Sequence, residues 1–420
     1  MRAAETRLDI ARRCLLPDLR VVVLSHMFPR GPEDWGGIFV HEQVRALREA
    51  GVDARVITGD LTLLVPGILR QGKFYRHLGP APAPKWRDVA GIPTLYFPYL
   101  AAYPPWWGRI AAVSYRREVK RLAKRVRAEF PFDLVHAHTA FLDGGAGAWL
   151  ARRCEVPLIL TEHTGPFSAL TEQPMMRWQT ERAINGADVV ITVSETLKRD
   201  ILARVRVREA NRIQVLGNGV NLEVFRPDGD APPDDGTVRA LWIGGFLPVK
   251  QPLMLIDSFS AALRQDPRLR LSMVGTGMLE GAIRAKIQSR GVEREVSIFP
   301  SATRPMVADY MRRHHFLVIS SQSETFGLVA IEALACGRPV LSTRCGGPEE
   351  TVRASACGEL VENSIEGLAK GFLTMSAHVG EFDAAGLHDY VRRNFGLDVI
   401  AARLKGIYMK VLEDREIGGH

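Results

Sequence analysis

Short apolar runs alternate along the chain with longer segments in which apolar residues recur every three or four positions. The first pattern is typical of strands buried on both faces, and the second of helices that cover a sheet. In the first half of the chain, the predicted helices are 40–50 and 109–129. The predicted strands there are 19–27, 53–60, 133–138, 157–163, 187–194 and 212–216. Residues 61–108 are rich in proline and aromatic residues, and we expect them to be irregular.

Residues 226–237 are acidic and rich in proline and glycine, which is typical of a linker or an edge loop. The same alternation then starts again. The predicted strands are 238–244, 269–275, 296–300, 316–321 and 339–343. The predicted helices are 251–264, 278–290, 304–314 and 326–336, followed by a helical segment over 364–416.

Repeated alternation of strands and helices predicts parallel sheets with helices on both faces. A chain of 420 residues is also too long for one ordinary core. We therefore expect an α/β protein of two doubly wound, Rossmann-like domains that face an interdomain cleft. The expected parts are an N-terminal domain over 1–220, a C-terminal domain over 221–395 and a helix over 396–420 that packs back on the N-terminal domain. Ligands of such sheets bind at the carboxyl ends of the strands.

Composition and charge narrow the function only slightly. No apolar run is long enough to span a bilayer, and no signal peptide follows the arginines near the N-terminus. The five cysteines are scattered without metal-ligand spacing, which fits a reduced, cytoplasmic protein. The formal net charge of +8 suits an anionic ligand, a nucleic acid or an acidic membrane surface without choosing among them.

The segment 320–340, SSQSETFGLVAIEALACGRPV, carries the most informative chemistry. After a strand and a polar loop, a helix is expected to begin near Phe326, with Thr325 as its N-cap. The free backbone N–H groups of Phe326, Gly327 and Leu328 would form an anion site suited to a diphosphate. Gly327 has no side chain, so a ligand can approach the backbone there closely.

Two carboxylates accompany this turn. Glu324 precedes the expected helix, and Glu332 lies nearly two turns inside it. A carboxylate can accept two hydrogen bonds from a ribose diol, which suits Glu332, and Glu324 can reach the hydroxyls of a bound sugar. Either residue alone is better explained as a charge that complements the helix dipole. The complete segment, with strand, turn, glycine and both carboxylates in order, favours a binding site.

The pair Glu324 and Glu332 resembles the E-x7-E motif of retaining GT-B glycosyltransferases, and its surroundings resemble glycosyltransferase family 4. Residues 346–350, GGPEE, resemble the GG-x-x-E loop of that family, and residues 218–220, NGV, resemble its segment between the domains. The resemblance implies a hexosyltransferase-type enzyme that binds a nucleotide sugar on its C-terminal domain and an acceptor on its N-terminal domain. Members act in polysaccharide or glycolipid biosynthesis, with uridine or guanosine diphosphate donors.

The loop LWIGGFLPVKQP resembles the part of the family that carries a donor-phosphate arginine and lysine. Lys250 matches the lysine, and Gly245 stands where the arginine is common. The resemblance therefore assigns much of the charge stabilisation of the leaving diphosphate to Lys250. Another arginine can substitute for the missing one, and Arg344 is a candidate, although a surface role explains it equally well.

Two glycine pairs resemble turns that face the donor in this family. Gly36 and Gly37 lie between the first predicted strand and the first predicted helix, like the family's glycine loop beside the donor phosphates. Without the resemblance, a simple turn explains them as well as a phosphate site does. Gly275 and Gly277 resemble the G-x-G turn near the nucleotide.

Three polar residues end predicted strands at the cleft. An isolated histidine in such a place is more often structural than catalytic. The resemblance, however, places His138 at the position of the family's active-site histidine near the sugar. Glu162 and His163 end another strand at the same edge and are candidates for the acceptor side.

No nucleophile can be assigned from the residues. The resemblance implies retention of anomeric configuration by front-face attack, with the acceptor proton passing to the departing phosphate. Lys250 and the helix N-terminus would stabilise that phosphate, and Glu324 and His138 would position the sugar. Residues 228–230, DGD, match the metal motif of a different glycosyltransferase fold, but no strand precedes them. We therefore expect no required metal and no cofactor.

A membrane contact is one interpretation of residues 109–127, which carry eight Lys or Arg residues and one Glu. Aromatic residues of 96–107 precede them, and basic helices beside aromatic loops can dock on anionic lipids. A peripheral location on the inner face of a membrane would suit a lipid-linked acceptor. A solvated helix face beside aromatics packed in the domain is an equal alternative.

Three other functions are compatible with parts of the sequence. A dinucleotide oxidoreductase should show G-x-G-x-x-G after the first strand, and 25–30 has no glycine. A sugar-nucleotide epimerase shares the two-domain shape, but would change the donor without an acceptor. A nucleic-acid-binding protein is suggested only by the basic charge, without a zinc-finger or RNP signature, so no nucleic-acid partner is expected.

Overall fold

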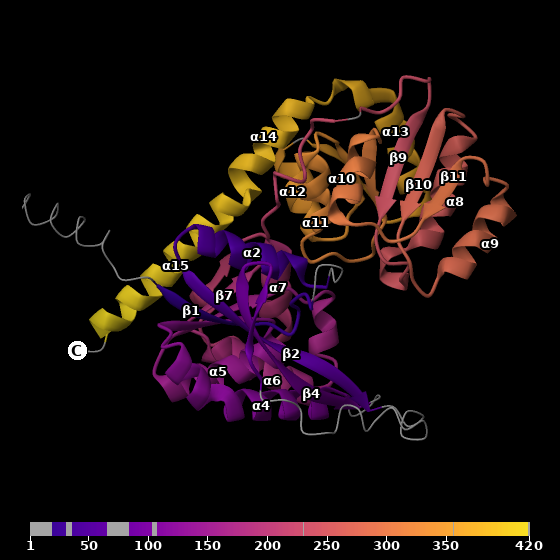
Figure 1. The fold of residues 1–420 in the computed structure, drawn as a ribbon. Coiled ribbons are helices and arrows are strands. Elements are labelled where there is room, and N and C mark those ends of the chain that lie inside the picture. Colours follow the sequence, from indigo (N-terminus) through magenta and orange to yellow (C-terminus); the bar gives the residue numbers. More distant parts are fainter. Residues whose placement is uncertain are drawn as a thin grey trace, which may run out of the picture.

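The structure is a computed structural model, and it describes residues 19–30, 36–64, 84–102, 107–229, 231–355 and 357–418. The chain forms two α/β units, each built around a β-sheet with helices packed against it (Figure 1). The first sheet has eight strands and the second has six. The predicted architecture of two doubly wound domains is confirmed.

The N-terminal sheet has the strand order β3-β4-β2-β1-β5-β6-β7-β8. Its strands are β1 Arg20–Leu24, β2 Asp53–Leu64, β3 Trp86–Val89, β4 Ile92–Ala102, β5 Leu134–His138, β6 Leu158–Glu162, β7 Val189–Thr192 and β8 Ile213–Val215. All neighbours pair in parallel except β3 and β4, which are antiparallel. The chain order therefore reverses between β1 and β5, where Val21 pairs with Leu134.

Strands β3 and β4 correct the expectation that residues 61–108 are irregular. Pro93 and Pro98 lie within β4, and proline within a run argues against a strand because it cannot donate to the ladder. Nevertheless, β4 pairs along β2 over the whole of Val56–Leu64, and Phe97 and Tyr99 are buried beneath the helices. Burial of these aromatic side chains outweighs the proline signal.

Helices cover both faces of the N-terminal sheet. They are α2 Ile38–Glu49, α4 Trp107–Glu129, α5 Gly145–Cys154, α6 Pro174–Gly186 and α7 Glu195–Arg204, with short turns η2 Ala140–Gly144, η3 Phe167–Leu170 and η4 Ala210–Arg212. Successive residues of β1 face opposite layers, as the two-residue period of a strand requires. Val22 belongs to the core that holds α4, α5 and α6, whereas Val23 belongs to the core that holds α2.

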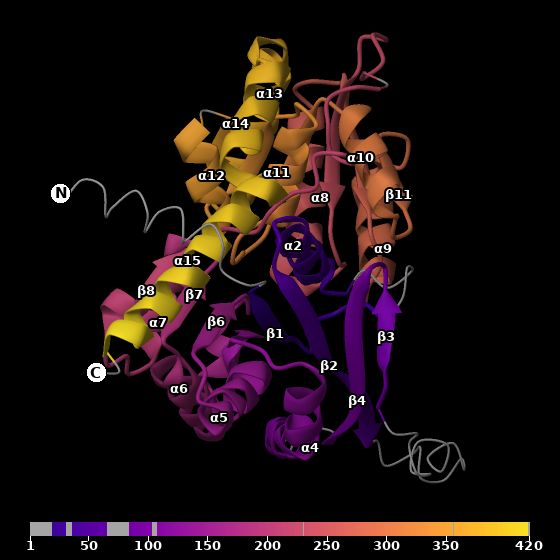
Figure 2. The same ribbon diagram turned by 60° about the vertical axis from the view of Figure 1, so that its left-hand side comes forward.

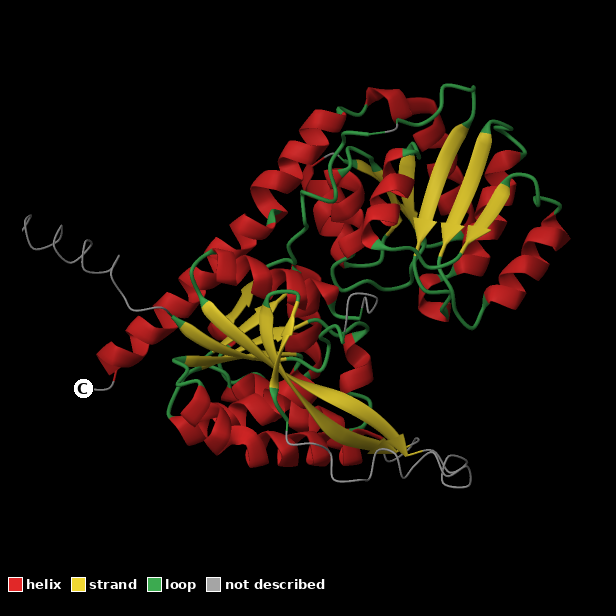
Figure 3. Cartoon of the chain, viewed as in Figure 1, coloured by secondary structure: helices red, strands yellow, loops and turns green. Residues whose placement is uncertain are grey.

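The C-terminal sheet is entirely parallel, with the order β11-β10-β9-β12-β13-β14. Its strands are β9 Val238–Ile243, β10 Leu269–Val274, β11 Val296–Phe299, β12 Phe316–Ile319, β13 Val340–Thr343 and β14 Gly358–Val361. Its helices are α8 Pro252–Leu263, α9 Glu280–Arg290, α10 Arg304–Arg312, α11 Leu328–Ala335, α12 Gly347–Ser355 and α13 Ile365–His378, with turns η5 Pro248–Lys250 and η6 Val379–Glu381. The order reverses between β9 and β12, and the arrowheads of the sheet point toward the N-terminal unit (Figure 3).

The last two helices return the chain to the N-terminal unit. Helix α14 Ala384–Phe395 packs beside α11, and α15 Leu397–Gly418 runs along the N-terminal unit next to α2 (Figures 1 and 2). Lys405 donates to the carbonyl oxygen of Ala50 at 2.7 Å, and Arg415 pairs with Asp188 at 3.2 Å. The C-terminal helix therefore ties the two units together.

A buried polar chain fixes α15 against the N-terminal sheet. The Tyr408 hydroxyl lies 2.7 Å from Nδ1 of His136, whose Nε2 lies 2.7 Å from the hydroxyl of Thr161. Burial lowers the pKa of His136 to about 3, so the imidazole is neutral near pH 7. One ring nitrogen therefore donates and the other accepts, and each is paired with a hydroxyl group that can do either.

The apolar side of the basic helix α4 is part of this core. Ala112, Leu122 and Val126 are all buried against the sheet, as is Phe97 of β4. These side chains are therefore not available to a lipid surface, whereas Tyr103 and Trp106 lie outside the described residues. The membrane contact stays a prediction. Within the described ranges, no helix is both long enough and apolar enough to span a membrane.

We predict that Tyr408→Phe lowers the free energy of unfolding by about 1–3 kcal/mol, because it leaves Nδ1 of His136 buried without its hydrogen-bond partner. The measurement is urea unfolding at pH 7. Tyr310→Phe is the matched control, since the Tyr310 hydroxyl has no hydrogen bond among the residues that the structure covers. Equal losses in the two variants would contradict the role given to Tyr408.

Candidate active site

The reversal of strand order between β9 and β12 opens a crevice at their carboxyl ends, where ligands of such sheets bind. Two hydrogen bonds join the loops that follow these strands. Gln322 N–H donates to the carbonyl oxygen of Val249 at 2.8 Å, and the Ser320 hydroxyl donates to the carbonyl oxygen of Lys250 at 2.8 Å. Residues separated by some seventy positions in the chain are thereby brought to one place.

Lys250 and Glu324 meet in this crevice. Nζ of Lys250 lies 2.5 Å from Oε1 of Glu324, which also accepts a hydrogen bond from the Ser321 hydroxyl at 2.7 Å. Both side chains are partly exposed. An ammonium group has three N–H donors, so Lys250 can hold Glu324 and still donate to a bound anion.

The neighbouring glycines are required by close backbone packing. A Cβ on Gly275 would lie 1.9 Å from the carbonyl oxygen of Gly244, and one on Gly277 would lie 2.8 Å from that of Phe246. Gly245 differs, because a Cβ there would meet only the Leu247 side chain, at 3.4 Å. The loop after β9 therefore has room for a side chain at the position of the missing arginine.

The start of helix α11 lies two residues later than predicted. The first helical residue is Leu328, and Gly327 is the N-cap with a positive φ of 79°. Thr325 is therefore not the cap, and its carbonyl oxygen accepts a hydrogen bond from the Ser194 hydroxyl of the N-terminal unit at 2.6 Å. Phe326 is buried against Phe395. The role of the backbone N–H groups of Phe326, Gly327 and Leu328 at a diphosphate stays a prediction.

Gly327 is needed for space as well as for conformation. A Cβ at this position would lie 2.5 Å from Cγ of Pro348. The packing of the GGPEE loop against the turn therefore accounts for a glycine here by itself, and the close approach of a ligand to its backbone stays a prediction.

Glu332 is buried inside α11 and is held by an arginine. Nη1 of Arg304 lies 2.7 Å from Oε1 of Glu332, and Nη2 of the same side chain lies 3.1 Å from Oε2 of Glu42 in α2. The guanidinium group also stacks on Phe225, 4.7 Å from the ring centre. One cation therefore bridges a carboxylate of each unit.

Two carboxylates around one guanidinium leave a surplus of negative charge. Burial raises the pKa of Glu332 to about 7, and the charge of Arg304 only partly opposes this. Burial likewise raises the pKa of Glu42. Glu332 is therefore close to half ionised at neutral pH, so its ability to accept two hydrogen bonds depends on pH.

The GGPEE loop also joins the two units. Oε1 of Glu350 accepts hydrogen bonds from the backbone N–H and the hydroxyl of Thr196, at 2.7 and 2.8 Å, and Oε2 accepts from the N–H of Glu195 at 3.0 Å. Glu350 thus caps the first turn of α7 from the other unit. Its neighbour Glu349 accepts from the N–H of Gly346 at 3.0 Å.

Two other features of the sequence, Arg344 and the DGD segment, lie apart from the crevice. Arg344 is ion-paired with Glu362 at 3.2 Å and with Glu349 at 3.8 Å, so a surface role accounts for it. In the DGD segment, Asp228 pairs with Arg226 at 2.9 Å, and Asp230 lies outside the described residues. Among the described residues, no cluster of three or more His, Cys, Asp or Glu residues is placed to hold a metal ion.

In the N-terminal unit, Gly37 is the N-cap of α2 and has a positive φ of 73°. A Cβ on it would lie 2.0 Å from the carbonyl oxygen of Met27. This close approach accounts for Gly37 by itself, and the role of Gly36 and Gly37 at a phosphate stays a prediction.

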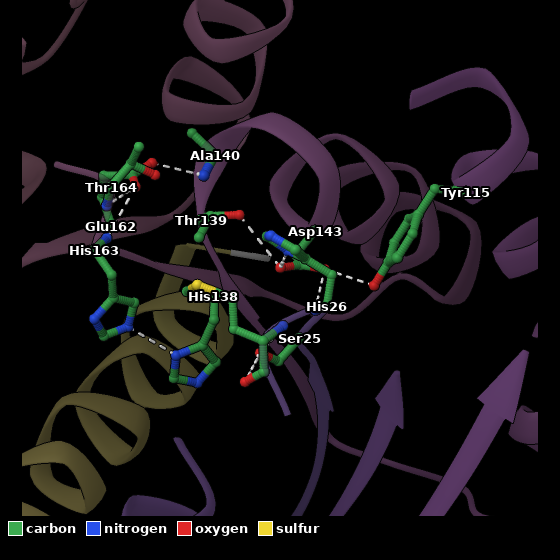
Figure 4. Close-up of polar contacts among 11 residues, drawn as sticks. Ser25, His26, Tyr115, His138, Thr139, Ala140, Asp143, Glu162, His163 and Thr164 are labelled. Carbon is green, nitrogen blue, oxygen red and sulfur yellow. Dashed lines mark hydrogen bonds and ion pairs between the residues drawn. The ribbon is translucent and has the colours of Figure 1, made fainter. Parts of the chain in front are cut away.

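His138 and His163 lie together at the carboxyl ends of β5 and β6 (Figure 4). Nδ1 of His138 lies 3.0 Å from Nε2 of His163, and the rings are stacked. The outer nitrogens, Nε2 of His138 and Nδ1 of His163, are buried without a hydrogen-bond partner. Burial lowers the pKa of both, to about 3 for His163, so both rings are neutral.

Glu162 is used within the N-terminal unit. Its carboxylate accepts backbone hydrogen bonds from Ala140 at 2.7 Å, His163 at 2.9 Å and Thr164 at 2.7 Å, and it is fully buried. These bonds shape the loops around the two histidines, and the assignment of Glu162 to the acceptor side stays a prediction.

The same edge holds a pair that the sequence patterns did not single out. Nδ1 of His26, after β1, lies 2.8 Å from Oδ2 of Asp143, after β5 (Figure 4). Arg304 and Glu42 were also missed, whereas Glu350 lies in the GGPEE segment that the sequence did single out. The available signal for His26 was a polar residue close behind a buried strand. The ion pairs join residues of the two units that lie far apart in the chain.

Comparison with known proteins agrees with this geometry. The family described as "Glycosyl transferase 4-like domain" matches residues 36–219, and the one described as "Glycosyl transferases group 1" matches residues 229–377. A D-inositol 3-phosphate glycosyltransferase of Nocardiopsis dassonvillei is 31% identical over 382 residues, covering 84% of each chain.

Two solved structures share the fold. Sucrose-phosphate synthase from Thermosynechococcus elongatus has a TM-score of 0.72 at 20% identity, covering 94% of this chain and all of that one. The HepE protein of Anabaena, in complex with UDP, has a TM-score of 0.69 at 17% identity, covering 93% of this chain and all of that one. The two-unit fold, the matched domains and the relative show that the chain belongs to the GT-B glycosyltransferases of family 4.

Proposed function

We propose that this enzyme transfers a sugar from a uridine or guanosine diphosphate sugar to a hydroxyl group of a polar acceptor. The observation that carries the proposal is the Lys250–Glu324 pair at 2.5 Å, placed where the C-terminal sheet reverses its order. A cation that keeps free donors at such a crevice suits a diphosphate, and a carboxylate beside it suits sugar hydroxyls. Binding of UDP by the HepE protein of the same fold adds support.

Each group has a proposed role in the transfer. Lys250 and the first free N–H groups of α11 stabilise the charge that develops on the leaving diphosphate. Glu324 and His138 position the sugar. Oε1 of Glu332 is bonded to Arg304, which leaves Oε2 to accept the ribose hydroxyls. The E-x7-E resemblance supports retention of the anomeric configuration.

We further propose a small phosphorylated polyol as the first acceptor to test. The support is the 31% identical relative, which is named for D-inositol 3-phosphate. A lipid-linked acceptor has less support, because the apolar side of α4 is packed against the sheet. Incubation with the donor alone separates the transferase from an epimerase, because an epimerase changes the donor without an acceptor.

We predict that one nucleoside diphosphate or its sugar raises the melting temperature of the wild type. The screen contains UDP, GDP, ADP and their sugars at millimolar concentration. Glu332→Gln should weaken this ligand about tenfold or more, since an amide accepts the ribose hydroxyls less strongly than a carboxylate does. Glu293→Gln, at an exposed glutamate, is the control and should bind as the wild type does. No stabilisation of the wild type by any of these ligands would overturn the proposed donor site.

The affinity for the stabilising sugar nucleotide should also depend on pH. Because the pKa of Glu332 is raised to about 7, the carboxyl group is mostly protonated at pH 6 and mostly ionised at pH 8. Binding should therefore be about tenfold weaker at pH 6 than at pH 8, as each pH unit below a pKa costs about a factor of ten. Calorimetry with the wild type and Glu332→Gln tests this, and the variant should show a flat profile. An equal slope in both proteins would exclude Glu332 as its cause.

We predict that Gly245→Arg tightens UDP binding by about tenfold or more, because a charged hydrogen bond is worth about 1.5–3 kcal/mol. The loop has room for the side chain, whose Cβ would contact only Leu247 at 3.4 Å. Gly245→Gln is the matched control for a long neutral side chain. If both variants bind UDP equally, or if the arginine weakens it, the diphosphate does not lie beside residue 245.

A further inference from the structure

Arg304 is the first residue of α10 and lies where the two units meet. Its guanidinium group pairs with Glu332 of α11 in its own unit and with Glu42 of α2 in the other. It also stacks on Phe225, a fully buried residue of the segment that connects β8 to β9. One side chain therefore contacts both units and the connection between them.

The two carboxylates hold different nitrogens of this guanidinium group. Nη1 lies 2.7 Å from Oε1 of Glu332, and Nη2 lies 3.1 Å from Oε2 of Glu42. All three side chains are nearly enclosed, with 13% of Arg304, 7% of Glu42 and 4% of Glu332 exposed. Because the group is planar and its donors form a rigid fork, the bond to Glu42 helps to fix the direction of the bond to Glu332.

The fork also settles which oxygen of Glu332 is left over. Oε1 is bonded to Arg304, and no hydrogen-bond partner of Oε2 occurs among the residues that the structure describes. A glutamate side chain can rotate about several bonds, so the pairing of one oxygen determines where the other lies. Arg304 therefore presents Oε2 in one place.

A purely structural role, in which Arg304 only joins the units, explains this arrangement less well. The units are already joined by Glu350, which caps α7, and by Lys405 of α15, which donates to the carbonyl oxygen of Ala50. Two buried carboxylates around one cation are also a poor source of stability, because well-packed apolar residues stabilise such a place equally or better. The second carboxylate therefore calls for another explanation.

The charges that act on Glu332 come from three helices. Burial raises its pKa to about 7, the charge and hydrogen bond of Arg304 oppose this, and the charge of Glu42 adds to it. Burial also raises the pKa of Glu42, against the charges of Arg304 and Arg45. Cys336 of α11 is a neutral thiol, because burial raises its pKa to about 12. Arg304 thus favours the ionised form of Glu332, and Glu42 disfavours it.

We propose that Arg304 is a positioning residue of the donor site, which holds the carboxylate of Glu332 in place for the ribose while Glu42 of the N-terminal unit holds Arg304. Neither Arg304 nor Glu42 needs to touch the nucleotide. The N-terminal unit nevertheless influences nucleotide affinity, because its carboxylate acts on the same guanidinium group.

This inference rests on the proposed function, because it requires a nucleotide whose ribose bonds to Glu332. It adds two residues outside the E-x7-E segment to that site, one from each unit. A wild type that binds no nucleoside diphosphate, or a Glu332→Gln variant that binds it as the wild type does, would overturn the proposed function and this inference with it. The variants below test the inference alone.

The test measures, by calorimetry between pH 5.5 and 9, the affinity for the nucleoside diphosphate found in the screen. Arg304→Gln should move the midpoint of the pH profile up by about one pH unit or more, because an adjacent cation favours a carboxylate. Binding at pH 7 should then be about fivefold weaker or more. Arg294→Gln, at an exposed arginine, is the matched control and should keep the wild-type profile.

Glu42→Gln should have the opposite effect on the profile. It keeps the shape of the side chain and removes its charge, so the midpoint should move down by about half a pH unit or more. Binding at pH 6 should then be about twofold to threefold tighter than in the wild type. A merely structural role would lower the stability of both variants and leave both midpoints at the wild-type pH.

Arg304→Lys separates position from charge. An ammonium group keeps a cation beside Glu332 but cannot reproduce the rigid fork to both carboxylates. The midpoint should therefore stay within about half a pH unit of the wild type, while binding at pH 9 should be about threefold weaker or more. Since loss of a buried cation can prevent folding, this variant and Glu42→Gln decide the question if Arg304→Gln does not fold.

Three results would overturn the inference. The first is a wild-type midpoint in a folded Arg304→Gln or in Glu42→Gln. The second is a shift of both midpoints in the same direction. The third is an Arg304→Lys variant that binds the nucleotide as tightly as the wild type at every pH.

Discussion

A parallel sheet whose strand order reverses sends neighbouring loops in opposite directions, and this opens a crevice at the carboxyl ends of the two central strands. The chain contains two such crevices, one between β9 and β12 and one between β1 and β5. Polar groups gather at both. Lys250 and Glu324 meet in the first, and His26 and Asp143 meet in the second. The division of labour that the family resemblance implies, with donor on one unit and acceptor on the other, fits this shared topology.

The contacts between the units involve the same groups that line the donor crevice. Arg304 joins Glu332 to Glu42, and Glu350 caps α7 of the N-terminal unit. A guanidinium group shared by two buried carboxylates is costly to break, since removal of the cation leaves unpaired charges in a site of low polarity. A ribose that bonds to Glu332 must share that carboxylate with Arg304. The proposed donor site would therefore be linked to the contact between the units through one side chain.

Much of this arrangement could be predicted from the sequence. The alternation of apolar runs and amphipathic segments located most strands and helices, and the E-x7-E segment indicated the donor crevice, because both depend on residues that are close in the chain. Strand β4 was missed because its prolines argue against a strand, although its aromatic side chains are buried in the core. The start of α11 was misplaced because Gly327, in a left-handed conformation, is the N-cap in place of Thr325. The Arg304 bridge and the His26–Asp143 pair depend on contacts over 262 and 117 positions, which local patterns do not encode.

A crystal structure of the protein with UDP would test the central claim most directly, because it shows where the diphosphate lies. The account predicts a diphosphate oxygen within hydrogen-bonding distance of Nζ of Lys250 and the ribose hydroxyls on the carboxylate of Glu332. It also predicts that the crevice between β1 and β5 stays free of nucleotide. A nucleotide bound between β1 and β5, or one that touches neither Lys250 nor Glu332, would contradict the assignment of donor and acceptor to the two units.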